Sequence, residues 1–222
     1  MRPSGPTSTT SPAPRRPVRA DAPPKPNQVR PELQRILDAV TAAPAYLRNG
    51  RRDLIAANRL GQALYSPMFA NPRRPVNVAR FVFLDPAARS FFLDWTTAAR
   101  DMVAALRIEA GRHPHDRALS DLVGELCTRS DEFAGFWASQ NVRFHRSGLK
   151  DVHHPAVGDL HLSFEAMDLP ADPGLSLIVY SVEPGSSSDD GLRLLASWGA
   201  TTDQTADQDH QPDVPASRPS PP

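Results

Sequence analysis

The sequence predicts an α+β fold that contains one antiparallel sheet of five short strands, a helical insertion between the second and third strands, and flanking helices. Two short apolar segments on either side of Asn49 and Gly50 indicate a hairpin. Apolar residues then recur at helical spacing from residue 78 to residue 137, and strand-like segments follow from residue 152 to residue 182. Strands that are interrupted once by a block of helices, instead of alternating with them, favour the α+β class.

The first predicted helix begins at Pro31, because proline is well suited to the first helical position, where its missing N–H group has no partner in any case. Its apolar side chains recur three and four residues apart, and Pro44 lies beyond its end. They are Leu33, Ile36, Leu37 and Val40.

A β-hairpin is expected next. Residues 45–47 form its first strand, Asn49 and Gly50 form a two-residue turn, and residues 54–56 form the returning strand. Asn58 then stands where the strand gives way to a helix over residues 60–65, so its side chain is expected to cap that helix.

The helical insertion is marked by aspartates at helix starts. Asp85 precedes Pro86, and Asp94 precedes an apolar stripe that begins at Trp95 and must be buried. A proline-punctuated loop through Pro67, Pro72 and Pro75 is expected to lead into the insertion. The expected helices run from Val78 to Phe83, from Pro86 to Phe92, from Asp94 to about Ala110, from Leu119 to Leu126 and from Asp131 to Trp137.

Three further strands and a last helix complete the prediction. Residues 152–154 form one strand, residues 160–166 alternate between apolar and polar as a half-buried strand does, and residues 175–182 are apolar on both faces. Residues 186–198 have the pattern of a helix.

The two ends of the chain differ in composition from its middle. Residues 1–30 are rich in proline and poor in large apolar side chains, so we expect a disordered, proline-rich linker. Residues 201–222 are expected to form a disordered acidic and proline-rich tail, which leaves residues 31–200 as one domain. The basic residues of the linker could attract nucleic acid, but they are sparse and lack interleaved aromatic side chains, which favours a solvated linker.

Cysteine content and hydropathy limit the cellular setting. Cys127 is the single cysteine, which excludes an intrachain disulfide and suits the reducing cytoplasm. No apolar run has the length of a membrane span, so we expect a cytoplasmic protein without membrane contact.

Three segments together resemble the MmyB-like ligand-binding domain of bacterial transcription regulators. They are FVFLDPAARSFFLDWTTAARD from Phe81, GLKDVHHPAVGDLHLSFEAMDLP from Gly148 and LIVYSVEPGSSSDDGLRLLASW from Leu177. The resemblance extends from about Arg30 to Trp198 and implies a PAS-like fold and a sensory role. In this family the domain usually follows a helix-turn-helix of the XRE type, a motif that the sequence lacks. We therefore expect no sequence-specific DNA binding by this chain, and action through a DNA-binding domain encoded upstream or carried by a partner, as a homodimer or as a heterodimer with a full-length regulator.

A PAS-like sheet covered by helices can enclose a small, apolar or acyl-like ligand. The expected apolar contacts are large side chains on the helices and on the last strand, although each also suits an ordinary core. They are Phe83, Trp95, Met102, Phe133, Trp137 and Tyr180.

Two polar side chains complete the candidate site. Arg100 lies near the edge of the buried stripe and, like Arg80 and Arg89, could meet a ligand carboxylate; the alternative is a surface ion pair with Asp101 or Asp85. His154, at a strand end, is expected to donate or accept a hydrogen bond in the pocket.

The sequence offers no enzymatic motif. It has no nucleophile elbow and no phosphate-binding glycine loop, and the adjacent His153 and His154 would point to opposite faces of a strand, which argues against a shared metal ion. We predict a non-enzymatic sensor that needs no cofactor or metal. A stand-alone carrier or enzyme, and a protein-interaction domain with a packed core, are the alternatives.

Overall fold

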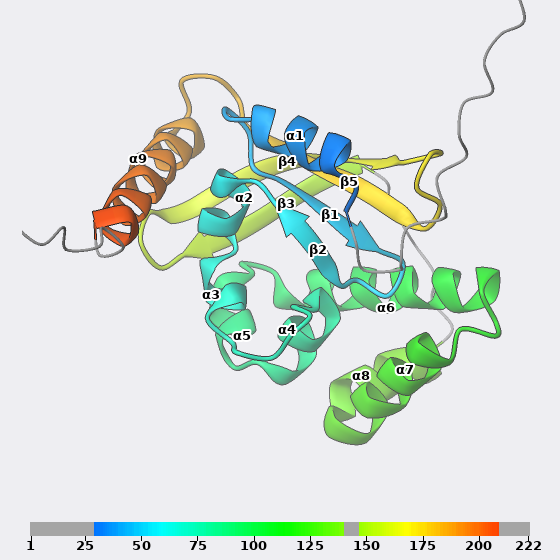
Figure 1. Ribbon diagram of the computed structural model, residues 1–222. Helices are drawn as coiled ribbons and strands as arrows, with labels where there is room; N and C mark the ends of the chain where they lie inside the picture. The colour runs from blue at the N-terminus through cyan, green and yellow to red at the C-terminus, as the bar shows by residue number, and fades with distance from the viewer. Residues whose placement is uncertain (1–28, 140–146, 209–222) are drawn as a thin grey trace, which may run out of the picture.

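The computed structural model describes residues 29–139 and 147–208, and Figure 1 shows one sheet with helices on both of its faces. The sheet has five strands in the order β2-β1-β5-β4-β3, and every neighbouring pair is antiparallel. The predicted antiparallel sheet and α+β class are confirmed, and the arrangement is compatible with a PAS-like fold. The strands are β1 (Ala45–Asn49), β2 (Leu54–Ala57), β3 (Ser147–His154), β4 (Gly158–Asp168) and β5 (Leu175–Ser181).

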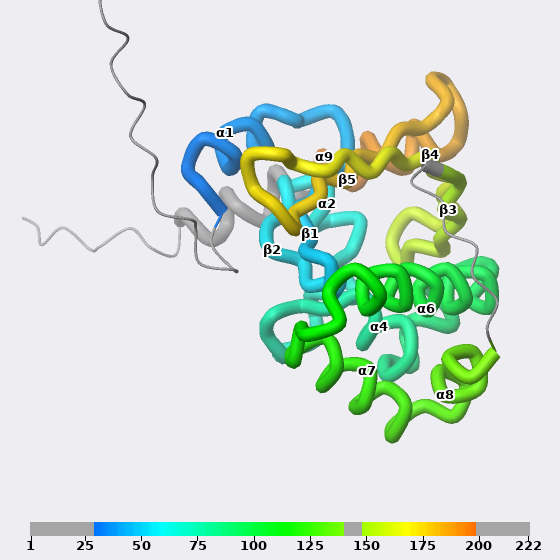
Figure 2. The backbone as a smooth tube through the Cα atoms, turned by 90° about the vertical axis from the view of Figure 1, so that its right-hand side faces the viewer, coloured from blue at the N-terminus to red at the C-terminus, as the bar shows by residue number. Residues whose placement is uncertain are grey.

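The helices cover the two faces of the sheet unequally. In Figure 1, α1 lies above the sheet, and the block between β2 and β3 lies below it. Figure 2 shows α6 running beneath the sheet, with α7 and α8 on the far side of α6. The helices are α1 (Pro31–Ala39), α2 (Arg59–Leu64), α3 (Ser66–Phe69), α4 (Val78–Leu84), α5 (Ala87–Phe91), α6 (Trp95–Arg112), α7 (Arg117–Arg129), α8 (Asp131–Ala138) and α9 (Ser187–Gln208).

Polar side chains cap helices that follow β2, as the sequence predicted for Asn58, Asp85 and Asp94. Asn58 accepts a hydrogen bond from the Gly61 amide at the start of α2, and Asp94 accepts one from the Thr97 amide at the start of α6. Asp85 accepts from the Ala87 amide and so stands at the start of α5. Caps of this kind contribute about 1 kcal/mol each and set where a helix begins.

The hairpin between β1 and β2 differs from the predicted two-residue turn. Asn49 belongs to β1, where its amide donates to the Asp53 carbonyl and its side chain bonds to both the amide and the carboxylate of Asp53. Those bonds hold Asn49 in the strand, and the loop becomes Gly50 to Arg52. The positive φ angle of the loop, 69°, falls on Arg52.

Other boundaries also depart from the predictions; β3, for example, begins at Ser147 and not at residue 152. Pro67 lies in the first turn of the short helix α3, where a proline needs no hydrogen-bond partner, and not in a loop. Helix α9 continues to Gln208, beyond the predicted end at Trp198, and no proline occurs between Pro184 and Pro212 to interrupt it.

Three apolar clusters hold these layers together. Leu33 and Leu37 of α1 pack with Ala45 and Leu47 against the outer face of the sheet. The main core lies between the inner face and helices α2 to α6. A third cluster joins α6 to α7 and α8 around Leu106 and Phe133. The inner face is therefore the one on which a buried pocket can form.

Candidate ligand-binding pocket

A pocket lies between the inner face of the sheet and helices α4 and α6. Its volume is about 160 Å³, similar to that of engineered apolar cavities that hold benzene, at about 150 Å³. A ring or a short stretch of chain therefore fits without rearrangement. The lining consists of Tyr46, Arg48, Arg52, Tyr65, Val78, Val82, Phe92, Ala98, Asp101, Met102, Ala105, Gly148, Leu149, Lys150, Phe164, Ile178 and Tyr180.

The alternation of side chains along the strands explains which residues reach the pocket. Tyr46 and Arg48 are two residues apart on β1, and Ile178 and Tyr180 are two residues apart on β5, so each pair shares a face. The register places Tyr46 opposite Ile178. Leu47, which lies between the two β1 residues, packs on the other face with α1.

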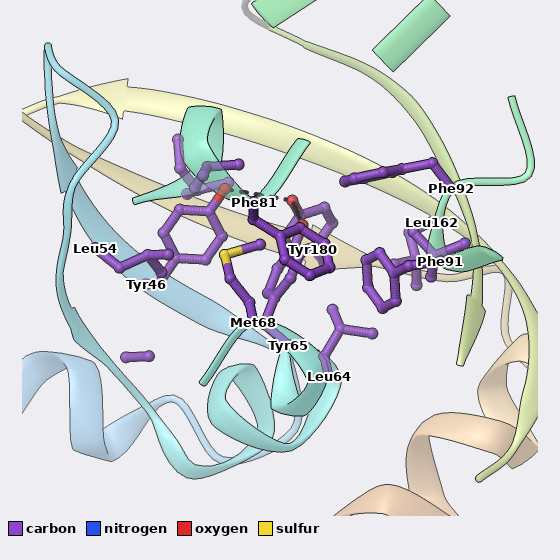
Figure 3. Packing of buried hydrophobic residues seen from close by; sticks show 14 of the residues in the cluster. Tyr46, Leu54, Leu64, Tyr65, Met68, Phe81, Phe91, Phe92, Leu162 and Tyr180 are labelled. Atoms are coloured by element: carbon purple, nitrogen blue, oxygen red, sulfur yellow. Dashed lines mark hydrogen bonds between the residues drawn. The ribbon is translucent and has the colours of Figure 1, made fainter. Parts of the chain in front are cut away.

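Three tyrosines converge at the wall of the pocket, and Figure 3 shows Tyr46, Tyr65 and Tyr180 among the packed aromatic side chains. The Tyr180 hydroxyl lies 3.4 Å from the Tyr46 hydroxyl and also bonds to the Tyr65 hydroxyl. Burial raises the pKa of both Tyr65 and Tyr180, so these phenols stay protonated. The hydroxyl groups of the three tyrosines therefore form one hydrogen-bonded cluster.

The pocket also contains an excess of cationic side chains. Arg48, Arg52 and Lys150 line it, and Asp101 is the one carboxylate among the described lining residues. Burial, followed by the charge of Arg48, lowers the pKa of Arg52 to about 9, and burial lowers the pKa of Lys150. Arg52 therefore keeps its positive charge at neutral pH, and burial weakens the preference of Lys150 for its charged form.

One polar atom of this group, the Nε atom of Arg48, lies away from solvent. It is buried, and no hydrogen-bond acceptor for it is present among the described residues. Buried guanidinium donors are ordinarily satisfied, because leaving a charged donor without a partner costs more than leaving a neutral one.

Two of the predicted ligand contacts line this pocket. Met102 projects from α6 and Tyr180 from β5. They come from segments that are 78 residues apart in the chain (180 − 102), and the fold brings them together across the same space. Both remain proposals as ligand contacts.

The other predicted aromatic side chains gather in the helical layer. Phe83 and Phe133 meet edge to face with ring centres 4.9 Å apart, and Phe133 stacks on Trp137 at 5.6 Å. Trp95 donates from Nε1 to the Val82 carbonyl at 2.8 Å and lies 6.0 Å from the Phe83 ring. None of the four belongs to the described pocket lining, so their part in ligand binding stays a prediction.

The predicted arginines have protein partners outside the pocket. Arg100 is exposed and lies 5.5 Å above the Phe136 ring. Arg80 pairs with Glu125 at 2.9 Å, and Arg89 pairs with Glu132 while lying over the Trp95 ring. These glutamates belong to α7 and α8, whereas the sequence analysis considered ion pairs with Asp101 or Asp85. The role of Arg100 toward a ligand remains a prediction.

His154 is buried at the end of β3 and is 2% exposed. Its Nδ1 atom accepts from the Ala156 amide, so Nε2 carries the proton and donates to the Ala63 carbonyl at 3.0 Å. Burial lowers the pKa of this histidine, which favours its neutral form. Its bonds tie β3 to α2 and α3, and it does not belong to the pocket lining described above.

Some of the pocket-lining residues that were not predicted could have been found from the sequence. Tyr46 and Arg48 alternate within a predicted strand, so a polar and an aromatic side chain could have been assigned to one face. Arg52 and Lys150 gave no such signal, because their burial depends on the loop conformation and on the position of α6.

The described residues hold no group of three or more histidine, cysteine, aspartate or glutamate side chains arranged to bind a metal ion. None of the described helices combines the length and the apolar character that a membrane crossing requires.

The comparisons with known proteins assign the chain to a family. Residues 29–195 match the MmyB-like transcription regulator ligand binding domain, which is more than half of the 222 residues. A search of curated proteins found no significant match. The matched range begins just before α1 and ends within α9, so it includes the whole sheet and every pocket residue. The chain belongs to the family of MmyB-like transcription regulator ligand-binding domains.

Proposed function

We propose that this protein is the ligand-sensing part of a bacterial transcriptional regulator and that it binds a small, largely apolar effector. The pocket between the sheet and α6 carries the proposal. Its walls are formed mainly by apolar side chains such as Val78, Val82, Met102 and Ile178. Concave apolar sites with a few well-placed polar groups are typical of small-molecule binding.

The size of the pocket supports a ligand with a narrow cross-section. A volume of about 160 Å³ suits a short alkyl segment or one ring. A fatty-acid-like effector would place part of its chain there, with the remainder leaving through the open side or displacing flexible side chains such as Met102.

The position of the pocket also suggests how binding becomes a signal. Val78 and Val82 belong to α4, while Ala98, Met102 and Ala105 belong to α6, so an occupant lies against both helices. A ligand that binds better to one placement of α6 shifts the population toward that placement. The shift would reach a DNA-binding domain on the same polypeptide or on a partner, in a homodimer or in a heterodimer with a full-length regulator, in the cytoplasm.

Native mass spectrometry of the purified protein tests this proposal, followed by denaturing extraction of any compound that copurifies. We expect a near-stoichiometric apolar compound. In the variant Ala105→Leu, whose larger side chain enters the pocket, we expect the adduct to be lost. The exposed Ala138→Leu serves as the matched control and should retain it.

The alternatives predict different results. A clean apo mass, together with no rise in melting temperature on adding short-chain fatty acids or alcohols, would favour a packed protein-interaction domain. Chemical conversion of the bound compound would point to an enzyme.

A further inference from the structure

A second cavity lies among α3, α4 and the C-terminal end of α7, and its described lining shares no residue with that of the first pocket. Its volume is about 180 Å³, which suits one ring, since engineered cavities of about 150 Å³ hold benzene. Met68 and Phe81 are buried and form part of an apolar wall. We call this cavity the arginine pocket, because Arg73, Arg80 and Arg129 also line it.

The three arginines of this pocket converge on Glu125 of α7. Arg73 donates from its two Nη atoms to both carboxylate oxygens at 2.6 and 3.2 Å, Arg80 donates from Nε at 2.9 Å, and Arg129 donates from Nη1 at 3.1 Å. Burial alone would raise the pKa of Glu125, but the hydrogen bonds from Arg73 and Arg80 outweigh it and lower the pKa from its ordinary value of 4.5. Glu125 therefore stays ionised and holds three guanidinium groups close together.

The carboxylate of Glu125 cannot accept from every donor of these arginines. A carboxylate has about four lone-pair sites, whereas one guanidinium group has five N–H bonds. The side chains of Arg73 and Arg129 are 51% and 55% exposed, so donors that do not bond to Glu125 can reach solvent. An oxyanion in the pocket would accept hydrogen bonds from them, because planar guanidinium groups match the geometry of carboxylate and phosphate.

Positive charges remain in excess around the arginine pocket when its carboxylates are counted. The three arginines are accompanied by Glu125 and by Asp85, which already accepts a hydrogen bond from the Ala87 amide. Arg74 adds a further positive charge beside the pocket, and its side chain donates to backbone carbonyl groups of its own loop. This excess favours an anion over a neutral ligand of the same shape.

We propose that the arginine pocket binds a small organic anion. Its carboxylate or phosphate group lies against Arg73, Arg80 and Arg129, and its apolar part, about the size of one ring, packs on Met68 and Phe81. The site goes beyond the proposed function, because it requires no ligand between the sheet and α6.

Calorimetric titration at low ionic strength tests the proposal with three probes that share one ring: benzyl alcohol, benzoate and phenyl phosphate. We expect the wild-type protein to bind an anionic probe about 10-fold more tightly than benzyl alcohol. This is the lower end of the range for charge-assisted hydrogen bonds, because two of the arginines are half exposed. The comparison of benzoate with phenyl phosphate identifies the anionic group. Inorganic phosphate, which lacks the ring, should bind more weakly than phenyl phosphate.

Arg129→Met removes one positive charge from the pocket and should reduce the affinity for the anionic probe to that for benzyl alcohol. Arg193→Met is the matched control, since Arg193 is also exposed and also pairs with a carboxylate four residues before it in a helix. It should keep the preference for the anion. Ala105→Leu, which fills the first pocket, should keep the preference as well.

Glu125→Gln provides a measurement that a purely structural role of the arginines would not change. The substitution removes the negative charge that the three guanidinium groups share, so the melting temperature without ligand should fall. An anion in the pocket would replace that charge. The better anionic probe should therefore raise the melting temperature of Glu125→Gln by more than it raises that of the wild-type protein.

The outcomes that would overturn the inference are distinct from those for the proposed function. Equal affinity of the wild-type protein for the three ring probes, or no binding of any of them, would exclude the anion site. A preference kept in Arg129→Met would exclude these arginines as its ligands, and a preference lost in Ala105→Leu would place the anion in the first pocket. An equal rise in melting temperature for Glu125→Gln and wild type would also contradict the site. The compound that copurifies with the protein tests the proposed function independently of these results.

Discussion

Arg30 and Asp172, which are 142 residues apart in the sequence, form a bidentate ion pair. Arg30 donates from Nε to Oδ1 at 2.7 Å and from Nη2 to Oδ2 at 2.6 Å. Arg30 immediately precedes α1, and Asp172 lies in the β4–β5 connection. The pair thus joins the start of α1 to the connection between β4 and β5.

Asp172→Asn should lower the melting temperature at pH 7, and the melting temperature of the variant should change less with pH than that of the wild-type protein. The hydrogen bonds from Arg30 hold the pKa of Asp172 below its ordinary value of 3.8. Because the folded-state pKa is lowered, this carboxylate stabilises the protein above pH 3.8 and loses that contribution as the pH falls through the folded-state value. Thermal unfolding between pH 7 and pH 3 measures the effect.

Asp38→Asn is the control for that experiment, since Asp38 is exposed on α1. A loss of stability at pH 7 as small as that of the control would show that the Arg30–Asp172 pair contributes nothing measurable, as is often found for pairs with one exposed partner.

Asn58→Ala should destabilise the protein by roughly 2–4 kcal/mol, because it removes several hydrogen bonds from buried backbone groups at once. The Asn58 oxygen accepts from the amides of Ala45 and Gly61, at 2.9 and 2.8 Å, and its amide group donates to the carbonyls of Ala43 and Val40. Denaturant unfolding measures the change.

Asn58→Asp separates these roles, since aspartate keeps both acceptor contacts and loses both donors. It should destabilise the protein at least as much as Asn58→Ala, because the second carboxylate oxygen would lie against the carbonyl oxygens of Val40 and Ala43. An alanine variant within 0.5 kcal/mol of wild type would contradict the idea that Asn58 organises this junction.

His154 should make the protein less stable as the pH falls below about 6.5. Burial lowers its pKa from the ordinary value of 6.5, so the unfolded chain takes up the proton more readily than the folded one. Stability from this group is therefore fully present above pH 6.5 and is lost as the pH falls through the folded-state value. The melting temperature of His154→Gln should vary less than that of wild type between pH 7 and pH 5.

His115, in an exposed turn, provides the control for this titration as His115→Gln. Identical pH profiles for His154→Gln and wild type would mean that other groups account for the acid sensitivity.

Met102→Ala should mainly affect ligand binding, whereas Trp95→Ala should mainly affect the stability of the fold. Met102 lines the pocket, so its truncation should reduce ligand-dependent thermal stabilisation. Trp95 packs on Phe83 and bonds to the Val82 carbonyl, so its truncation should lower the ligand-free stability by about 3–5 kcal/mol. Ligand-dependent shifts in melting temperature measure both; a shift lost in Trp95→Ala but kept in Met102→Ala would place the ligand among the aromatic side chains of the helical layer.

Local sequence signals predicted much of the fold because local interactions produce it. Asn58 and Asp94 cap the helices expected from them, and the alternating segment at residues 160–166 lies within β4. The hairpin turn was predicted incorrectly, since Asn49 also bonds through its side chain to Asp53, and that contact moves the turn to Gly50–Arg52.

The residues of the pocket were harder to predict from the sequence than the fold was. Large aromatic side chains at helical spacing are compatible with a ligand pocket or with helix packing, and sequence spacing does not distinguish the two. In the structure α8 carries Phe133 and Trp137, and these rings pack on protein side chains. Met102 and Tyr180 reach the pocket because it lies between α6 and the sheet.

The sequence alone determined the helix starts, most of the strands, the sheet class and the family, because caps, apolar periodicity and family motifs act over short stretches of chain. The tertiary structure decided which side chains share a buried space. Arg48, Arg52 and Lys150 come from a strand, a loop and a distant strand, and they line one cavity through the antiparallel register and the position of α6. The physical reason is that burial depends on contacts between distant segments, whereas hydrogen-bonded helices and turns depend on neighbours in the chain.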